Sequence, residues 1–353
     1  MNITFRWYGR DNDTVSLADV KQIPNVKGIV WALHKTPVGE IWSKEEIQSE
    51  VAYIRSFDFH AEVVESVNVH ESIKLGLPER DRLIENYKQT LLNLSEVGVK
   101  VVCYNFMPIF DWTRTSLFHP NEDGSTSLFF EAEKIKNIDP MALLQEVKEN
   151  SHLTLPGWDH LSKERLQILF EQYKSIDEHK LWENLAYFLN EVAPFAEKVG
   201  IHLGIHPDDP PWTIFGLPRI ITGYESYMKL KQITASSGNQ FTLCTGSLGA
   251  NPNNDLLSIF NDFIKDAPFL HLRNVKTFEN GDFIETSHRT ADGSIDMAGI
   301  VKILAENNYS GYVRPDHGRH IWGEKSRAGY GLYDRALGIM YLNGLWDAYM
   351  RNE

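Results

Sequence analysis

Eight short β-type runs that alternate with helical segments constrain the fold of this chain more than any other feature. Each run is rich in Val, Ile, Phe or Tyr and is bounded by turn-forming residues, which is typical of β-strands. The runs lie at residues 3–8, 28–33, 60–66, 99–105, 201–206, 241–245, 269–273 and 311–314. Strands that alternate with helices favour a parallel sheet, and eight such units predict an α/β fold, a (β/α)8 TIM-type barrel.

The segments between the runs carry the signals of helix starts and ends. Ser43 and Glu46 have the spacing of a capping box, in which each side chain bonds the backbone of the other residue. Gly98 and Gly200 each follow an apolar stripe at helical spacing, where glycine commonly ends a helix. A doubly wound sheet would alternate in the same way, but no GxGxxG turn follows the first run.

The interval between the fourth and fifth runs is too long for a simple loop and helix. It spans roughly 95 residues, whereas a loop plus helix needs about 20–30. We therefore predict a single barrel domain over residues 1–353 with an insertion at about 106–180. Its first part resembles a loop with a turn at Asp123-Gly124, and its remainder is predicted to be largely helical. Because the insertion follows the carboxyl end of a strand, we expect it on the active face of the barrel.

Charge and cysteine content exclude several functional classes. The net charge of −13 argues against nonspecific binding to nucleic acid, although basic groups gathered locally would still accept a small anionic substrate. Two cysteines rule out a disulfide framework. The amino terminus lacks a signal peptide, and no apolar run approaches the roughly 18 residues needed to span a bilayer. We expect a cytoplasmic protein with neither a membrane nor a nucleic-acid partner.

Residue types that bind metals fall at the carboxyl ends of the last four runs. His206 ends the fifth run, Cys244 lies near the end of the sixth, His271 is in the seventh and Asp316 follows the eighth. Each alone has an ordinary structural explanation, such as a buried cysteine or a turn aspartate. Their spacings of 38, 27 and 45 residues lack the close pairs of structural zinc sites. Together they predict a catalytic divalent ion such as Mn²⁺, Fe²⁺, Co²⁺ or Zn²⁺ at the barrel mouth.

Two residues beyond the last run are candidates for proton transfer. A divalent cation stabilises negative charge that develops next to a carboxylate, but proton removal also needs a positioned base, and hydroxyl departure needs an acid. His317 and Tyr330 are the best placed for these roles. The structural alternatives are that His317 supports the neighbouring Asp316 and that Tyr330 is an exposed loop aromatic.

Polar residues near other strand ends are candidates for substrate binding. Arginines there would bind an anionic, hydroxylated substrate in bidentate fashion, although any single one is also consistent with a surface salt bridge. The arginine candidates are Arg6, Arg219 and Arg273, and the weaker polar candidates are His34, Asn105, Asp208 and His288.

Several segments resemble the mannonate dehydratase family. They are FRWYG at 5–9, VCYNFMPIFDWTRT at 102–115, HPDDPP at 206–211, GLPRI at 216–220, CTGS at 244–247, RPDHG at 314–318 and GYGLYDRALG at 329–338. The resemblance extends from the first run to the last. It implies a metal-dependent lyase on a TIM-type barrel that removes water from D-mannonate. The product would be 2-dehydro-3-deoxy-D-gluconate, in hexuronate (glucuronate) catabolism.

The same resemblance implies roles for individual residues. Mn²⁺ or Fe²⁺ would be bound by the four ligands His206, Cys244, His271 and Asp316. His317 and Tyr330 would be the acid and base, with Tyr333 close enough in sequence to compete with Tyr330. A homo-oligomer is also implied.

The same residue types are also consistent with other functions. The nearest is a metal-dependent sugar isomerase, or a dehydratase acting on a related aldonate, although isomerase barrels usually use Glu and Asp rather than a thiolate. A non-catalytic binding protein is a further alternative, and the negative charge disfavours an abasic-site nuclease. Because a thiolate is a soft ligand, Cys244 would bind Zn²⁺ or Co²⁺ at least as well as Mn²⁺.

Overall fold

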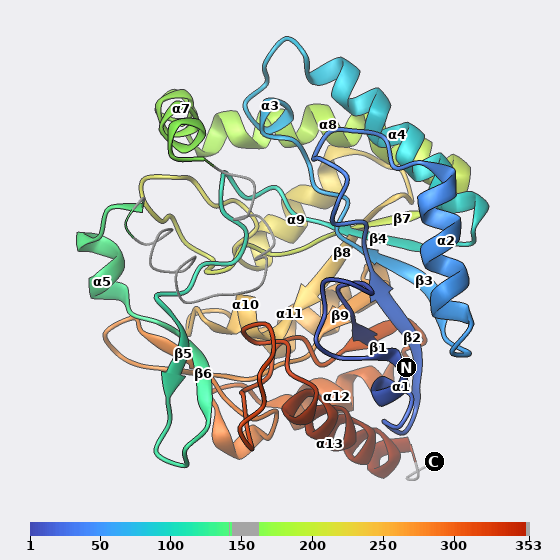
Figure 1. Cartoon of the computed structure of the whole chain (residues 1–353). Helices are drawn as coiled ribbons and strands as arrows, with labels where there is room; N and C mark the ends of the chain where they lie inside the picture. The colour runs from blue at the N-terminus through green and yellow to red at the C-terminus, as the bar shows by residue number, and fades with distance from the viewer. Residues whose placement is uncertain (141, 143–161, 351–353) are drawn as a thin grey trace.

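A closed barrel of eight parallel strands forms the centre of the computed structural model, which describes residues 1–140, 142 and 162–350 (Figure 1). Around the barrel the strand order is β1-β12-β9-β8-β7-β4-β3-β2, and pairing of β1 with β12 closes it. The predicted (β/α)8 barrel is confirmed. The strands are β1 (Asn2–Arg6), β2 (Val26–Trp31), β3 (His60–Glu65), β4 (Val101–Tyr104), β7 (His202–Ile205), β8 (Asn239–Cys244), β9 (Phe269–His271) and β12 (Tyr312–Arg314).

Helices cover the outside of the barrel and follow the predicted caps. The Ser43 hydroxyl accepts the backbone N–H of Glu46 at the start of α2, and Gly200 ends α8 with a φ of +74°. The α-helices are α1 (Leu17–Val20), α2 (Lys44–Arg55), α3 (Glu71–Lys74), α4 (Arg80–Glu96), α5 (Ala132–Asn137), α7 (Lys163–Tyr173), α8 (Glu178–Val199), α9 (Tyr224–Ile233), α10 (Thr245–Gly249), α11 (Leu256–Phe263), α12 (Met297–Glu306) and α13 (Tyr333–Met350). Two 3₁₀ turns are η1 (Ile264–Asp266) and η2 (Thr290–Asp292). Among the described residues, none of the helices combines the length and hydropathy that a bilayer-spanning segment requires.

Successive strand residues pack on opposite sides of the barrel wall. Val63 belongs to a small cluster inside the barrel, whereas the next residue, Val64, packs in the large core between strands and helices. This alternation follows from the two-residue period of a strand. The inner cluster consists of Val30, Val63, Val101, Cys103 and Phe269, with Tyr312 against it. Because side chains fill the interior, a ligand can enter only at an end of the barrel.

A second, antiparallel sheet lies beside the barrel and was not predicted. Its strand order is β10-β11-β6-β5, and we call it the added sheet. The hairpin β5–β6 projects from the barrel in Figure 1. The strands are β5 (Ser116–Pro120), β6 (Thr126–Phe130), β10 (Val275–Thr277) and β11 (Phe283–Glu285).

The added sheet corrects the prediction for the insertion after the fourth barrel strand. The Asp123-Gly124 turn is present, with Gly124 at a φ of +82°, but the segments on either side of it are strands rather than loop. Of these two strands β6 pairs with β11, which comes from the connection after β9, about 150 residues later. Pairing at that separation leaves no local signal. Of the remainder predicted as helical, α5 and α7 are helices, and residues 141 and 143–161 lie outside the described part.

Candidate active site

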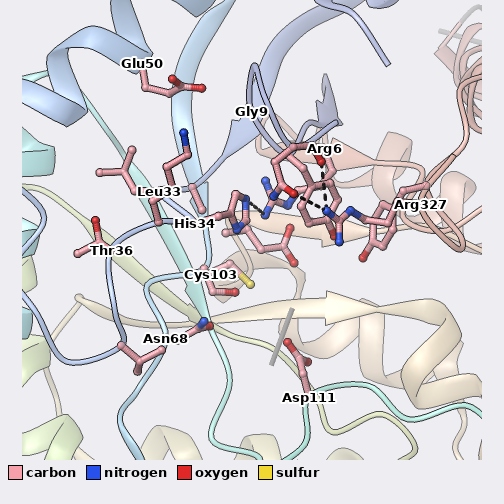
Figure 2. A pocket seen from close by; sticks show the side chains of 18 of the residues that line it. Arg6, Gly9, Leu33, His34, Thr36, Glu50, Asn68, Cys103, Asp111 and Arg327 are labelled. Atoms are coloured by element: carbon pink, nitrogen blue, oxygen red, sulfur yellow. Dashed lines mark hydrogen bonds between the residues drawn. The ribbon is translucent and has the colours of Figure 1, made fainter. Parts of the chain in front are cut away.

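A cavity of about 780 Å³ opens at the carboxyl ends of the barrel strands. Six strands contribute to its walls, either at their last residues or just beyond them. The contributing side chains are Arg6, His34, Glu65, Asn105, His206 and Asp316. Figure 2 shows Arg6 and Arg327 close together on one wall, with Asp111 apart from them. This is the end at which barrel enzymes place their catalytic groups.

The four predicted metal ligands meet at this end of the barrel. His206 Nε2 lies 3.0 Å from His271 Nδ1, and the Cys244 thiol donates to Asp316 Oδ2 at 3.4 Å. His271 Nδ1 is 3.9 Å from Asp316 Oδ1. One ligand atom from each of His206, Cys244 and His271 falls within 4.8 Å of the other two. Residues up to 72 positions apart in sequence are therefore in contact.

The chemistry of this cluster fits a divalent metal ion. Two imidazole nitrogens 3.0 Å apart can both contact one ion at about 2.1 Å. Imidazole, thiolate and carboxylate together suit the transition metals from Mn²⁺ to Zn²⁺. Burial lowers the pKa of His271 well below its usual value, so that its imidazole is neutral, as a metal ligand must be. The described residues could thus hold such an ion.

His206 and Asp316 are charged by their surroundings. Burial lowers the pKa of His206, but its hydrogen bond to Cys244 and the neighbouring carboxylates Glu65 and Asp316 raise it more, to about 9. A proton and a metal ion therefore compete for this imidazole. Burial raises the pKa of Asp316, yet Arg314, whose Nη1 lies 2.6 Å from Oδ1, outweighs it together with other cations and holds the carboxyl ionised.

Glu65 contacts His271 from the side opposite His206 and was missed by the sequence analysis. Its Oε1 lies 3.5 Å from His271 Nε2, and Arg314 Nη2 donates to the same oxygen at 2.9 Å. A carboxylate behind a histidine is the arrangement that orients metal-binding imidazoles. Glu65 is the last residue of β3, so its place at a strand end was the only available signal.

His317 and Tyr330 form a hydrogen-bonded pair next to the cluster. His317 Nε2 lies 2.9 Å from the Tyr330 hydroxyl, and the two rings meet edge to face at 4.9 Å. Burial raises the pKa of Tyr330 well above its usual value, so the phenol keeps its proton. The competing candidate Tyr333 begins α13 and is 42% exposed. Of the two tyrosines, Tyr330 is the one that reaches His317.

The predicted substrate-binding residues separate into two groups. Arg6, Asn105 and the weaker candidate His34 line the cavity. The other four are not among the lining residues in the described part of the chain, and their side chains are engaged elsewhere. They are Asp208, which accepts two backbone N–H groups; Arg219, which donates to the Asp111 carbonyl; Arg273, which bonds three carboxylates; and His288, which lies 2.6 Å from the Pro315 carbonyl oxygen.

Tyr8 and Arg327 also line the cavity, although neither was predicted to have a role there. The ring of Tyr8 lies between the guanidinium groups of Arg6 and Arg327, each 4.2 Å from its centroid. Tyr8 stands two residues after Arg6 just past β1, and Arg327 belongs to the loop before α13. This stack adds two fixed cations to the cavity wall.

The closed parallel barrel gathers imidazole, thiol and carboxylate groups at its strand ends beside the hydrogen-bonded His317–Tyr330 pair, and the protein is an enzyme of the TIM-barrel class. A solved xylose isomerase domain protein from Planctomyces limnophilus shares the fold, with a TM-score of 0.56, 11% identity and 99% of each chain covered. The sequence model of the D-mannonate dehydratase (UxuA) family matches residues 1–353, and the chain belongs to that family. The family predicted from the motifs is confirmed.

Individual relatives match over nearly their whole length. The chain is 64% identical to the mannonate dehydratase of Bacillus subtilis (strain 168), covering 99% of this chain and 97% of that protein. It is 56% identical to that of Shouchella clausii (strain KSM-K16), covering 99% and 98%. The crystal structure of the mannonate dehydratase from Streptococcus suis serotype 2 has a TM-score of 0.91 and 44% identity, covering 100% of this chain and 95% of that one.

Proposed function

We propose that this chain is a metal-dependent lyase that dehydrates D-mannonate to 2-dehydro-3-deoxy-D-gluconate. The observation that carries the proposal is the meeting of His206, Cys244, His271 and Asp316 beside the His317–Tyr330 pair. Membership of the D-mannonate dehydratase family supports the same substrate and reaction. It disfavours the alternative of a sugar isomerase or of a dehydratase for a related aldonate.

A divalent ion, Mn²⁺ or Fe²⁺ by family resemblance, would be held by the four residues of the cluster. When bound, it would stabilise negative charge on the substrate carboxylate and so acidify the neighbouring C2–H bond. Arg314 and Arg273 contact the Asp316 carboxylate and keep it ionised. Glu65 orients His271 from behind.

The His317–Tyr330 pair moves the protons. One member takes the C2 proton, the C2–C3 double bond forms, and the C3–O bond breaks as the other member protonates the leaving hydroxyl to give water. The resulting enol rearranges to the C2 ketone, with C3 becoming a methylene. Because the two groups share a hydrogen bond of 2.9 Å, the abstracted proton can return to the donor and restore the pair.

Arg6 and Asn105 are proposed to bind the substrate, because both line the cavity. Arg219, Arg273, Asp208 and His288 are proposed to hold its walls, because their polar atoms contact protein groups. The family further supports a role in glucuronate catabolism in the cytoplasm, and a homo-oligomeric assembly.

An assay of metal-depleted protein on D-mannonate tests this function. Mn²⁺, Fe²⁺, Co²⁺ and Zn²⁺ are restored separately, and the product is identified by mass spectrometry. We expect activity only after a metal is restored, with a product lighter than the substrate by one water molecule. A product of unchanged mass would establish isomerisation, and undiminished turnover without metal would refute the role of the ion.

A further inference from the structure

We propose that Glu285, on β11 of the added sheet, is a positioning residue that fixes the orientation and tautomer of His317. The added sheet would then take part in catalysis although none of its strands belongs to the barrel. This role rests on the proposed function, because it matters only if His317 transfers protons. It extends that function to a residue for which the sequence analysis gave no signal.

The contacts of His317 define which nitrogen carries its proton. Its Nδ1 lies 3.1 Å from Glu285 Oε1, and its Nε2 lies 2.9 Å from the Tyr330 hydroxyl. An ionised carboxylate only accepts hydrogen bonds, so Nδ1 must donate. In the neutral ring Nε2 is then an acceptor, and Tyr330 donates to it. Glu285 thus determines the direction of the hydrogen bond within the acid–base pair.

The surroundings of Glu285 keep it ionised. Arg114 Nη2 donates to its Oε1 at 2.9 Å, and Arg273 Nη1 donates to the same atom. All three side chains are at least 98% buried. Burial alone would raise the pKa of Glu285, but the charges of Arg273, His317 and Arg114 lower it by more, so that it falls to about 2. A carboxylate held by two buried arginines has little freedom to move.

The added sheet fixes the backbone of Glu285. In the β10–β11 hairpin this residue pairs with Val275, and two residues earlier Phe283 pairs with Phe130 of β6. The rings of Phe283 and Phe130 are stacked at 5.1 Å. Arg114 stands two residues before β5, so the insertion after β4 supplies a cation to the carboxylate that the connection after β9 places against His317. The sheet is the structure that joins these two segments.

A simpler role for Glu285 would be to neutralise Arg114 and Arg273, and kinetics separates the two roles. Glu285→Gln is compared with Glu279→Gln, an exposed glutamate in the same hairpin. For Glu285→Gln we expect kcat to fall by about 10–100-fold, the effect of losing a carboxylate that orients a functional histidine. KM and bound metal should change by less than about twofold, because the loss concerns proton transfer rather than binding. The Glu279→Gln control should match wild type.

Glu285→Asp distinguishes orientation from charge balance. Aspartate keeps the negative charge for both arginines but is one methylene shorter, which withdraws it from His317. We expect a melting temperature close to wild type with kcat still reduced by about tenfold. Full activity in Glu285→Asp would overturn the proposal, and so would Glu285→Gln with wild-type kcat. If Glu285→Gln fails to fold, kcat of Glu285→Asp still distinguishes an orienting role from charge balance.

The tautomer itself can be observed by ¹⁵N NMR of histidine-labelled protein loaded with diamagnetic Zn²⁺, with His317→Asn identifying the signal. We expect His317 as the Nδ1–H form in wild type and a mixture with the Nε2–H form in Glu285→Gln. An Nε2–H ring in wild type would contradict the proposal. Wild-type protein inactive on D-mannonate would instead refute the proposed function, and the tautomer would still be measurable.

Discussion

The barrel and the added sheet serve the site in different ways. Barrel strands β7, β8, β9 and β12 bring His206, Cys244, His271 and Asp316 together, at the end where this fold generally places its ligands. The added sheet brings a buried glutamate, Glu285, to His317, and buried Arg114 bonds that glutamate in turn. The barrel strands thus gather the proposed ligands, whereas segments outside the barrel, by our proposal, orient the proposed acid–base group.

Replacing the proposed sulfur ligand on the barrel should have the largest effect. Cys244→Ser is expected to lower metal affinity by more than about 100-fold and turnover with it, because even residues behind the ligands contribute about 10–100-fold. Metal content by mass spectrometry and kcat on D-mannonate measure both. Cys103→Ser is the matched control, since Cys103 is equally buried but packs in the inner barrel cluster.

Full metal content and activity in Cys244→Ser would remove this residue from the ligand set. Loss of metal in Cys103→Ser would instead move the ion toward Glu65 and Cys103, which also have ligand atoms close to His271.

Changing the proposed acid–base pair should lower turnover and spare the metal. Tyr330→Phe removes the hydroxyl 2.9 Å from His317, and a positioned acid or base contributes about 10²–10⁴-fold. We expect kcat to fall within that range, with metal content at the wild-type level. Tyr333→Phe is the control and should leave kcat unchanged, because Tyr333 is exposed at the start of α13. The reverse pattern would assign the role to Tyr333.

The smallest expected effect is on stability: the buried charge of Glu285 should make the free energy of unfolding depend on pH. The pKa of Glu285 lies at about 2 in the folded protein against 4.5 for a free glutamate. Because this pKa is lower in the folded than in the unfolded protein, the ionised Glu285 stabilises the fold at pH values above about 4.5. This contribution is lost as the pH falls from about 4.5 toward 2. From pH 7 to pH 4, wild type should lose about 1 kcal/mol more unfolding free energy than Glu285→Gln.

Urea denaturation at the two pH values measures this difference, with Glu279→Gln as the reference. An equal loss in wild type and Glu285→Gln would mean that Glu285 has an ordinary pKa in the folded protein.

The barrel was predictable because its signals are local. Each strand is a short apolar run next to turn residues, and caps such as Ser43 and Gly200 involve neighbours within a few positions. The added sheet was not predictable, because β6 and β11 pair across about 150 residues. The sequence of residues 126–130 does not indicate that this strand pairs with residues 283–285.

The candidate site likewise has a part that could be predicted from the sequence and a part that could not. The proposed ligands could be named because metal-binding residue types recur at the ends of successive strands. Arg273 also follows a strand, yet its guanidinium bonds Asp209, Glu285 and Asp316 rather than lining the cavity. Residue type and position cannot distinguish a cation facing substrate from one enclosed by carboxylates, since only the packing decides.

Metal content and kcat of Cys244→Ser and Glu285→Gln, measured in parallel with wild type, test the division between barrel and added sheet most directly. We predict that Cys244→Ser loses both metal and turnover, whereas Glu285→Gln retains its metal and loses turnover alone. Loss of metal to the same extent in both variants would contradict this account, because the added sheet would then maintain the whole site rather than orient His317.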